Sequence, residues 1–240
     1  MEQSLVIIPT YNEIENIEAI IKAVFQQSES VHVLVVDDNS PDLTAGKVKE
    51  LQATYSRRLF LEEREAKTGL GTAYIHGFKW ALARDYQYIF EMDADFSHNP
   101  VDLPRLYSAS LEEQADVVIG SRYIKGVNVV NWPLTRVLMS YLASVYVRII
   151  TGMKIHDTTA GFVCYKRRVL EAINLDEIKF IGYAFQIEMK FKAYLGGFKI
   201  LEIPVIFTDR TKGESKLSSG IISEAIFGVI SMKMKSLFKK

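Results

Sequence analysis

Residues 88–100, YIFEMDADFSHNP, run from strand-forming residues into two aspartates that are separated by a single residue. Aromatic and β-branched residues favour a β-strand, whereas the Asp, Ser, Asn and Pro that follow favour a turn. We therefore predict a buried strand that ends just before Asp93 and Asp95. Similar units occur elsewhere in the chain, and together they decide the fold.

Apolar runs at residues 5–9, 31–36 and 115–120 also end in polar loops, and segments with helical spacing lie between them. The first such helix is predicted over residues 12–27, with Asn12 as its N-cap and Glu15 completing a capping box. Strands that alternate with helices predict an α/β fold with a mainly parallel, Rossmann-like central sheet and helices on both faces. In such a sheet the loops PTYNE, DDNSPD, DADFSHNP and GSRY share the rim at the carboxyl ends of the strands, where ligands bind.

The second half of the sequence is less regular. We predict an apolar helix from Pro133 to Gly152, a strand in AGFVCYKR, a helix in FQIEMKFKAYLGG and a strand in FKILEIPVIFT. Pro204 in this last strand indicates an edge or a bulge, because proline cannot donate a hydrogen bond to a neighbouring strand. The polar segment DRTKGESKLSSG is predicted to be a mobile loop. We expect one domain over residues 1–217 and an amphipathic, basic helix over residues 218–240.

The composition argues against several classes of function. The 240 residues include 29 Lys and Arg and 29 Asp and Glu, so the formal net charge is zero and no nucleic-acid partner is expected. The single cysteine, Cys164, excludes an intramolecular disulfide and a cysteine-based zinc site. The first strand is preceded by only a few polar residues, and the longest apolar stretch, residues 137–153, contains two serines and Arg148. We expect a cytoplasmic protein that can touch a membrane.

Asp93 and Asp95 repel each other at neutral pH, so placing them together needs a compensating charge. Mg²⁺ supplies one, since it binds one or two carboxylates and completes its shell with water and substrate phosphates. The alternatives are a solvated acidic turn and a phosphatase-type nucleophilic aspartate. The second alternative is disfavoured, because that motif usually follows the first strand, whereas this one follows the fourth and continues into Phe96 and Ser97.

The first two loops offer groups that suit a nucleoside. Tyr11 can stack on a base, Glu13 can accept a hydrogen bond from a ribose hydroxyl, and Asp37 is a second acceptor. The alternative is that these residues only start a helix or form a turn. No G-x-G-x-x-G or Walker sequence is present, which argues against a dinucleotide site or a P-loop.

Taken in order, the motifs PTYNE, VVDDNSPD, GLGTAYIHGFKWA, MDADFSHNP, GSRY, DTTAGF, GYAFQIEM and DRTKGESK resemble those of the polyprenol (dolichyl) phosphate mannosyltransferases. These enzymes belong to the inverting glycosyltransferase family 2 and have the GT-A fold. The resemblance covers roughly residues 4–218. Two departures are Leu43, where the family usually has Gly, and the lack of a predicted membrane span after the catalytic part. The first departure affects a turn more than the chemistry.

The resemblance implies a metal-dependent transfer of mannose from GDP-mannose to a polyprenyl phosphate, with Mg²⁺ or Mn²⁺ as cofactor. It places the metal on Asp93 and Asp95. The implied donor-binding residues are Pro9, Tyr11, Glu13, Asp37, Asp93, Ala94, Asp95, Arg210 and Lys216. The implied ligands of the acceptor phosphate are Arg122, Arg136 and Ser140. The candidates for catalysis are Asp95, Arg122, Asp157 and Arg210.

The chemistry of the acceptor decides which side chains are needed. A hydroxyl acceptor requires a general base, for which Asp157 is the best candidate. A phosphate monoester has a second pKa of about 6 and is already a dianion at pH 7, so it needs cations to hold it. Arg122 and Arg136 therefore favour a phosphate acceptor, the alternative being that they are ordinary surface arginines. With a phosphate acceptor, Asp157 would orient the sugar or fix a loop.

Three further residues near these motifs have open roles. Gln186 and Glu188 are two residues apart, so a helix does not place both on one face, and at most one is expected in the sugar pocket. His98 is expected to fix a loop rather than to bind the metal. Alternative functions are a related transferase with a UDP-sugar or a hydroxyl acceptor, and a non-catalytic, nucleotide-sugar-binding membrane adaptor.

A polyprenyl phosphate lies in a bilayer, so the enzyme must reach the membrane surface. The helix after Trp132 and the C-terminal helix are suitable, and the cations at the tail are Lys233, Lys235, Lys239 and Lys240. At roughly 1 kcal/mol per cation near an anionic surface, such lysines support reversible docking on the cytoplasmic face. The alternative is that these helices pack on the core, on a second copy of the chain or on a membrane subunit.

Overall fold

The computed structural model describes residues 1–182, 184–209 and 219–238, with the side chains of residues 219–226 excepted. The elements are β1 (Ser4–Thr10), α1 (Ile17–Phe25), β2 (His32–Asp37), α2 (Thr44–Gln52), β3 (Leu59–Glu63), α3 (Leu70–Leu82), β4 (Tyr88–Glu91), the 3₁₀ helix η1 (Pro100–Asp102), α4 (Leu103–Glu112), β5 (Val117–Ser121), β6 (Val129–Val130), α5 (Leu134–Thr151), β7 (Val163–Lys166), α6 (Arg167–Ala172), the 3₁₀ helix η2 (Leu175–Glu177), α7 (Ala184–Leu195), β8 (Ile200–Pro204), β9 (Phe207–Thr208) and α8 (Ser219–Phe238).

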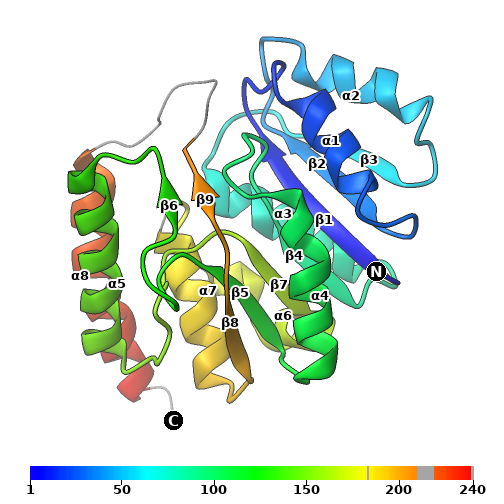
Figure 1. Ribbon diagram of the computed structural model, residues 1–240. Helices are drawn as coiled ribbons and strands as arrows, with labels where there is room; N and C mark the ends of the chain where they lie inside the picture. The colour runs from blue at the N-terminus through cyan, green and yellow to red at the C-terminus, as the bar shows by residue number, and fades with distance from the viewer. Residues whose placement is uncertain (183, 210–218, 239–240) are drawn as a thin grey trace.

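Within the described residues the central sheet has seven strands in the order β3-β2-β1-β4-β7-β5-β8 (Figure 1). The pairs β1–β2, β1–β4, β2–β3 and β5–β8 are parallel, whereas β7 runs antiparallel to both β4 and β5. Because β7 is antiparallel to both of its neighbours, β4 and β5 point the same way. The predicted α/β fold with a mainly parallel sheet is confirmed, and β8, which ends at Pro204, is an edge strand as expected.

The helices form layers on both faces of the sheet, as predicted. Along β1, Leu5 and Ile7 point to one core and Val6 and Ile8 to the other, following the two-residue period of a strand. The first core contains apolar residues of α3, α6 and α7, and the second contains those of α1, α2 and α4. Nearly continuous apolar strands such as β1 and β2 are typical of a sheet that is buried on both faces.

The predicted start of the first helix is wrong. Asn12 has a φ of +58°, and the helix begins at Ile17 rather than near Asn12. Backbone N–H groups of the predicted first turn donate instead to side chains of the loop after β2: Asn12 to Ser40, Glu13 to Thr44 and Ile14 to Asp42, each at 3.0 Å. These contacts satisfy backbone donors at the start of the predicted helix, among them the Asn12 N–H that the capping box would have served, so tertiary hydrogen bonds replace the local signal.

The helices α5 and α8 lie side by side at one edge of the molecule (Figure 1). Val147 of α5 and Val229 of α8 are buried in the first core, and Lys233 of α8 donates a hydrogen bond to the carbonyl of Thr151 at the end of α5, at 3.2 Å. Within the described residues α5 is the one helix long and apolar enough to cross a membrane, and 17% of it is buried. The position of the apolar helix predicted after Pro133 is confirmed.

Candidate active site

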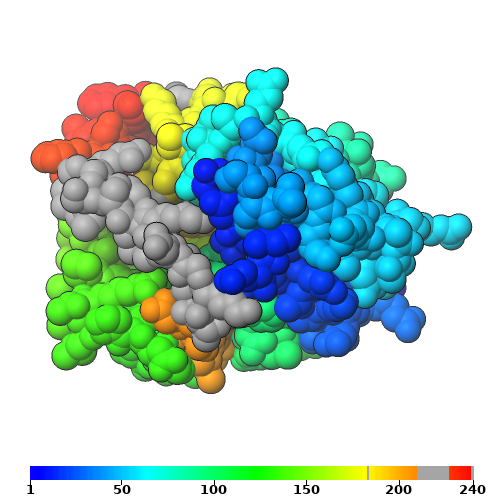
Figure 2. All heavy atoms as spheres, turned by 90° about the horizontal axis from the view of Figure 1, so that it is seen from above, coloured from blue at the N-terminus to red at the C-terminus, as the bar shows by residue number. Residues whose placement is uncertain are grey.

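The loops predicted to share one rim do so. The strands β1, β2, β3, β4 and β5 point the same way, so the segments that follow them gather at their carboxyl ends. Figure 2 looks onto this end of the molecule, with the N-terminal segments in blue on one side and the green and orange segments of the second half on the other.

Asp93 and Asp95 lie in the turn directly after β4, and Ala94 between them is buried. Asp95 is 8% exposed, and its Oδ1 accepts a hydrogen bond from the Ser97 backbone N–H at 3.1 Å. The side chain of Asp93 is 37% exposed, and the Tyr74 hydroxyl lies 3.5 Å from its Oδ1. One carboxylate is therefore held in place by the turn, while the other reaches toward solvent.

His98 supports this turn from the inside. Its Nδ1 accepts a hydrogen bond from the Asp93 backbone N–H at 3.0 Å, and its ring stacks on Phe162 with the centroids 5.0 Å apart. Burial lowers the pKa of His98, although Asp93 and Asp95 oppose the shift. An Nδ1 that accepts a backbone hydrogen bond is not available to a metal, so His98 occupies the loop-fixing position that the sequence predicts.

The donor set at the turn fits a hard divalent cation. Asp93 and Asp95 offer carboxylate oxygens, which Mg²⁺ and Mn²⁺ prefer. Among the residues that the structure describes, no group of three His, Cys, Asp or Glu side chains could enclose a metal ion. A cation at this turn would therefore take its other ligands from water and from substrate phosphates, as Mg²⁺ commonly does.

Asp37, a predicted nucleoside ligand, shapes the loops around it. It is 1% exposed, and its Oδ1 accepts hydrogen bonds from the hydroxyls of Thr10 at 2.8 Å and Ser40 at 2.6 Å. Its Oδ2 accepts a third hydrogen bond from the Ser40 backbone N–H at 2.8 Å. These bonds tie the end of β1 to the loop after β2. A contact between Asp37 and a nucleoside stays a prediction.

The other predicted nucleoside ligands meet at the same corner of the rim. Pro9 pairs with Val36 across β1 and β2. Glu13 accepts a hydrogen bond from the Asn16 side-chain amide at 3.0 Å, which holds its carboxylate near the start of α1. The ring of Tyr11 lies beneath Lys67, with 4.3 Å between Nζ and the ring centroid.

Two cations at this corner are absent from the sequence-based set of site residues. Arg64 follows β3 directly and pairs with buried Asp38, with 3.0 Å between Nε and Oδ1. Burial raises the pKa of Asp38 despite the opposing charge of Arg64. Lys67 lies three residues further on and covers Tyr11. Since the third strand was predicted to be parallel to its neighbours, the polar residues after it could have been assigned to the rim.

Arg122, the first residue after β5, forms a buried ion pair with Asp157. Nε donates to Oδ2 at 2.7 Å, Nη2 donates to Oδ1 at 2.6 Å, and the Arg122 backbone N–H donates to Oδ2 at 2.9 Å. Nη2 also donates to the Thr159 hydroxyl at 2.8 Å. Burial raises the pKa of Asp157, but the charge and hydrogen bonds of Arg122 outweigh this effect and leave the pKa below its usual value.

This pairing bears on the predicted role of Asp157 as a general base. A carboxylate that accepts hydrogen bonds on both oxygens and has a lowered pKa is a weak proton acceptor. The geometry therefore favours the alternative in which Asp157 fixes its surroundings. Because Nε and Nη2 bind Asp157, the two N–H groups of Nη1 lie on the side of the guanidinium that faces away from Asp157. Within the described part of the chain, Nη1 makes no hydrogen bond.

Aromatic rings surround the Arg122 guanidinium. Its central carbon lies 5.2 Å from the ring centroid of Tyr123, 5.4 Å from that of Trp132 and 5.5 Å from that of Phe207. The charge is thereby kept out of water on several sides, which strengthens its interaction with any anion that reaches it.

Arg136 approaches the same tryptophan. Its guanidinium carbon lies 4.1 Å from the ring centroid of Trp132, and Nη1 pairs with Asp209 at 2.9 Å. Ser140, one turn further along α5, interacts with Tyr123. The structure thus brings Arg122 and Arg136, two of the residues predicted to bind the acceptor phosphate, to one indole ring, and links the third, Ser140, to Tyr123 beside Arg122. Trp132 and Asp209 are additional members of this cluster that the sequence did not single out.

Gln186 and Glu188 have separate partners, as their spacing predicts. The Glu188 carboxylate accepts hydrogen bonds from the backbone N–H groups of Lys179 at 2.9 Å and Phe180 at 3.1 Å, so it fixes the segment before α7. Gln186 is buried and accepts a hydrogen bond from Lys190 at 3.2 Å. Arg210 and Lys216, predicted to contact the donor phosphates, lie outside the described residues.

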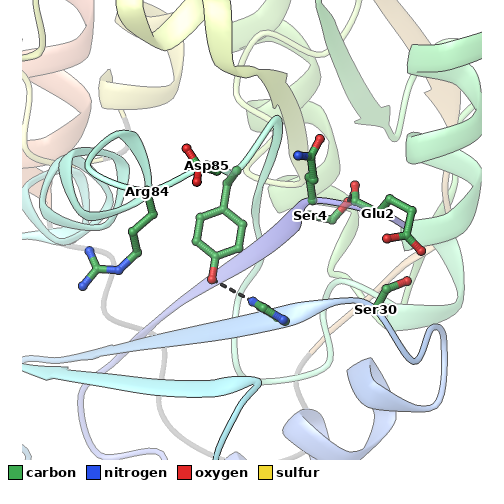
Figure 3. Close-up of a pocket in the computed structure, with 8 residues that line it drawn as sticks. Glu2, Ser4, Ser30, Arg84 and Asp85 are labelled. Atoms are coloured by element: carbon green, nitrogen blue, oxygen red, sulfur yellow. Dashed lines mark hydrogen bonds between the residues drawn. The ribbon is translucent and has the colours of Figure 1, made fainter.

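A hollow also lies at the opposite end of the sheet (Figure 3). Its lining residues are Glu2, Gln3, Ser4, Ser30, His32, Arg84, Asp85 and Tyr86. His32 and Tyr86 share a hydrogen bond of 2.8 Å, and the guanidinium of Arg84 lies 3.5 Å from the ring centroid of Trp80. Because this hollow is at the amino ends of β1 and β2, it is separate from the rim described above.

Comparison with known proteins identifies the family of the chain. The model of the glycosyl transferase family 2 matches residues 5–173. The polyprenol monophosphomannose synthase of Mycolicibacterium smegmatis is 46% identical over 228 residues, which cover 95% of this chain and 86% of the relative. The undecaprenyl-phosphate mannosyltransferase of Micrococcus luteus is 45% identical over 225 residues, which cover 94% of this chain and 91% of the relative.

Solved structures share the fold at lower sequence identity. A mannosyltransferase from Pyrobaculum calidifontis in complex with GDP-Man and Mn²⁺ matches with a TM-score of 0.62 and 17% identity, over 99% of this chain and 64% of that chain. Glucosyl-3-phosphoglycerate synthase from Mycobacterium tuberculosis, in complex with Mn²⁺, uridine-diphosphate and glucosyl-3-phosphoglycerate, matches with a TM-score of 0.66 and 16% identity, over 97% and 78%. With its GT-A fold and its match to the family model over most of its length, the chain is an enzyme that belongs to the glycosyl transferase family 2.

Proposed function

We propose that this enzyme transfers mannose from GDP-mannose to a polyprenyl phosphate, with Mg²⁺ or Mn²⁺ held by Asp93 and Asp95. Relatives that are 45–46% identical over nearly the whole chain are named for polyprenyl-linked mannosyl transfer. The observation that carries the proposal is the convergence of Arg122 and Arg136 on Trp132, beside the turn of the two aspartates: Phe207 contacts both Trp132 and His98 of that turn.

On the donor side, charge develops on the departing diphosphate as the sugar bond breaks. A divalent cation on Asp93 and Asp95 would stabilise that charge, and such electrostatic stabilisation is usually the largest catalytic term. The turn is suited to this role because the Ser97 backbone N–H holds the Asp95 carboxylate and His98 holds the Asp93 backbone N–H before a ligand arrives. Arg210 and Lys216 stay proposed contacts of the donor phosphates.

On the acceptor side, the geometry suits a nucleophile that needs no base. A phosphate dianion can attack the sugar unaided once cations hold it. Asp157 binds Arg122 through Nε and Nη2, which leaves the Nη1 side of the guanidinium to meet the acceptor. Arg136 would supply a second charge from α5, and Ser140 a hydroxyl. In this proposal Asp157 positions Arg122 and takes no proton.

We further propose that the enzyme docks on a membrane surface through α5 and α8. Among the side chains that the structure describes on these two helices, the large apolar ones that are exposed are Leu134, Leu138, Met139, Tyr141, Leu142, Ile149, Phe227, Ile230, Met234, Leu237 and Phe238. Lys233 points inward to Thr151, so it contributes less to docking than the sequence implies. Lys235 is exposed, and Lys239 and Lys240 lie outside the described residues.

The direct test is turnover of labelled GDP-mannose with a short-chain polyprenyl phosphate and Mn²⁺. The unphosphorylated polyprenol and UDP-glucose serve as the matched acceptor and donor controls. We expect product only with the phosphorylated acceptor and a strong preference for GDP-mannose. Equal use of UDP-glucose would overturn the donor assignment, and transfer to the free alcohol would overturn the acceptor assignment.

A pair of variants on α5 tests the role of Arg136. Arg136→Gln should raise the KM for the acceptor by on the order of tenfold while leaving the KM for GDP-mannose nearly unchanged. Arg148→Gln, in the last turn of the same helix, is the matched control and should behave as wild type in detergent solution. An equal effect of both variants on acceptor KM would argue against a specific phosphate contact at Arg136.

A further inference from the structure

Lys190, in the middle of α7, is fully buried. Its Nζ donates hydrogen bonds to the Ala160 carbonyl at 2.6 Å, to the Gln186 carbonyl at 3.2 Å and to Gln186 Oε1 at 3.2 Å. An ammonium group has three donors, and here it has three acceptors. Burial lowers the pKa of Lys190, and the charges of Glu91 and Asp157 oppose that shift. Burying a charged ammonium group costs free energy of folding, and its hydrogen bonds must offset that cost. The groups that Lys190 binds are therefore held firmly in place.

The shortest of the three bonds reaches the turn that carries Asp157. The Ala160 backbone N–H lies 3.5 Å from the Asp157 carbonyl, which closes the turn. At its other end, Glu202 of β8 accepts hydrogen bonds from the backbone N–H groups of His156 at 2.7 Å and Asp157 at 2.9 Å. The turn is thus held by Glu202 at one end and by Lys190 at the other, and the Asp157 side chain projects from it to Arg122.

The same lysine faces the strand that leads to the metal-binding turn. Glu91, the last residue of β4, is fully buried on the α7 side of the sheet and interacts with Lys190 through space. Asp93 follows two residues later. Lys190 therefore lies between the strand that presents the aspartates and the turn that orients Arg122, which are the two halves of the site.

We propose that Lys190 is a positioning residue of the transfer reaction: by holding the Ala160 carbonyl it fixes the turn of residues 157–160, and through Asp157 it sets the orientation of Arg122. The inference rests on the proposed function, because the consequence for the reaction assumes that Arg122 binds the acceptor phosphate. The mechanical part, in which Lys190 orders the turn, stands without that assumption.

A lysine that only balances the charge of Glu91 would behave differently from one that positions the turn. Burial raises the pKa of Glu91 to about 8, and the Lys190 charge opposes that rise. Lys190→Met alone therefore also changes the charge state of Glu91, and this variant can lose stability for that reason. The double variant Glu91→Gln/Lys190→Met removes both ionisable groups, so it leaves no buried charge unpaired, but it still lacks the bond to Ala160. Glu91→Gln alone keeps that bond, and Lys192→Met, on the same helix and partly exposed, is the matched control.

Three measurements decide between these roles: amide hydrogen exchange of residues 157–161 in the ligand-free enzyme, the acceptor KM and kcat, and the GDP-mannose Kd with Mn²⁺. In the double variant we expect faster exchange in the turn and an acceptor KM raised by about tenfold or more, with the donor Kd within about twofold of wild type. Glu91→Gln and Lys192→Met should keep wild-type exchange and wild-type acceptor KM.

Several outcomes would overturn the inference. One is a folded double variant whose turn exchanges at the wild-type rate, and another is a Glu91→Gln variant that shows the same loss as the double variant. If wild-type enzyme uses no polyprenyl phosphate, the proposed function fails. In that case the exchange data still decide whether Lys190 orders the turn, so the two failures can be told apart.

Discussion

Replacing Asp157 with Asn removes the counter-charge of Arg122 while keeping the size of the side chain. Arg122 is 7% exposed and Asp157 is fully buried, and three hydrogen bonds join them. In the variant the guanidinium stays buried without a partner charge, and loss of one partner from a buried pair typically costs about 3–5 kcal/mol. For a domain of this size, each kcal/mol corresponds to about 2–4 °C, so the melting temperature should fall by roughly 6–20 °C.

Thermal unfolding followed by circular dichroism measures this effect. The matched control is Asp176→Asn, since Asp176 also pairs with a cation, Lys79, but its side chain is 78% exposed. A surface pair contributes at most about 1 kcal/mol, so the control should melt within a few degrees of wild type. The double variant Arg122→Gln/Asp157→Asn should recover much of the lost stability, because no charge is left unpaired, yet it should not recover acceptor binding.

The pH dependence gives a second check on the same pair. The pKa of Asp157 in the folded chain lies below its usual value of 3.8, so the pair stabilises the fold above that value. This contribution is lost as the pH falls through the folded-state pKa. The gap in melting temperature between wild type and Asp157→Asn should be constant from about pH 5 to about pH 8 and should narrow below about pH 4. A gap of less than about 2 °C at neutral pH would refute the reasoning.

Three other substitutions test separate features. Asp209→Asn removes a carboxylate that competes with the acceptor phosphate for Arg136, so the acceptor KM should fall several-fold; an unchanged KM would rule out that competition. Leu43→Gly should stabilise the fold by about 0.5–1 kcal/mol in urea unfolding, because Leu43 has a φ of +66° and is 74% exposed; a loss of stability would contradict this. Gly77→Ala should cost about 1–3 kcal/mol, since a Cβ there would lie 2.7 Å from Ile7 Cγ2, and wild-type stability would show that the core can yield.

The sequence predicts the architecture well because the signals for it are local. Strand-forming runs that end in polar loops identify β1, β2, β4 and β5, and helical spacing identifies the elements between them. Pro204 indicated an edge or a bulge, and β8 is indeed an edge strand. Leu43 was expected to affect a turn, and it adopts the left-handed conformation for which glycine is usually chosen.

Features that depend on contacts between distant residues could not be predicted in this way. The start of α1 was misplaced because its donors bind side chains of the loop after β2, 28 to 31 residues away. The pairing of Arg122 with Asp157 spans 35 residues, and that of Arg136 with Asp209 spans 73. Each arginine was identified as a candidate, but its carboxylate partner, and hence its orientation, follows only from the fold.

The same limit applies to the buried support of the site. Lys190 lies in a segment, FQIEMKFKAYLGG, whose pattern predicts a helix and says nothing about which side chain reaches Ala160. The turn of residues 157–160 leads into β7, which lies between β4 and β5 and is antiparallel to both. This strand order places the turn within reach of Lys190 on α7. Sequence motifs therefore identify the groups that meet the substrate more readily than the groups that hold them.

The claim on which the account depends most is that a cation on Asp93 and Asp95 anchors the donor diphosphate. Isothermal titration calorimetry of GDP-mannose, with Mn²⁺ and with a chelator, tests it on wild type, on Asp95→Ala and on Asp85→Ala, an exposed acid at the other end of the sheet. We expect chelation to weaken binding at least about tenfold in wild type and in Asp85→Ala, and Asp95→Ala to bind weakly whether or not the metal is present. Donor affinity that is the same with metal, with chelator and in Asp95→Ala would contradict the account.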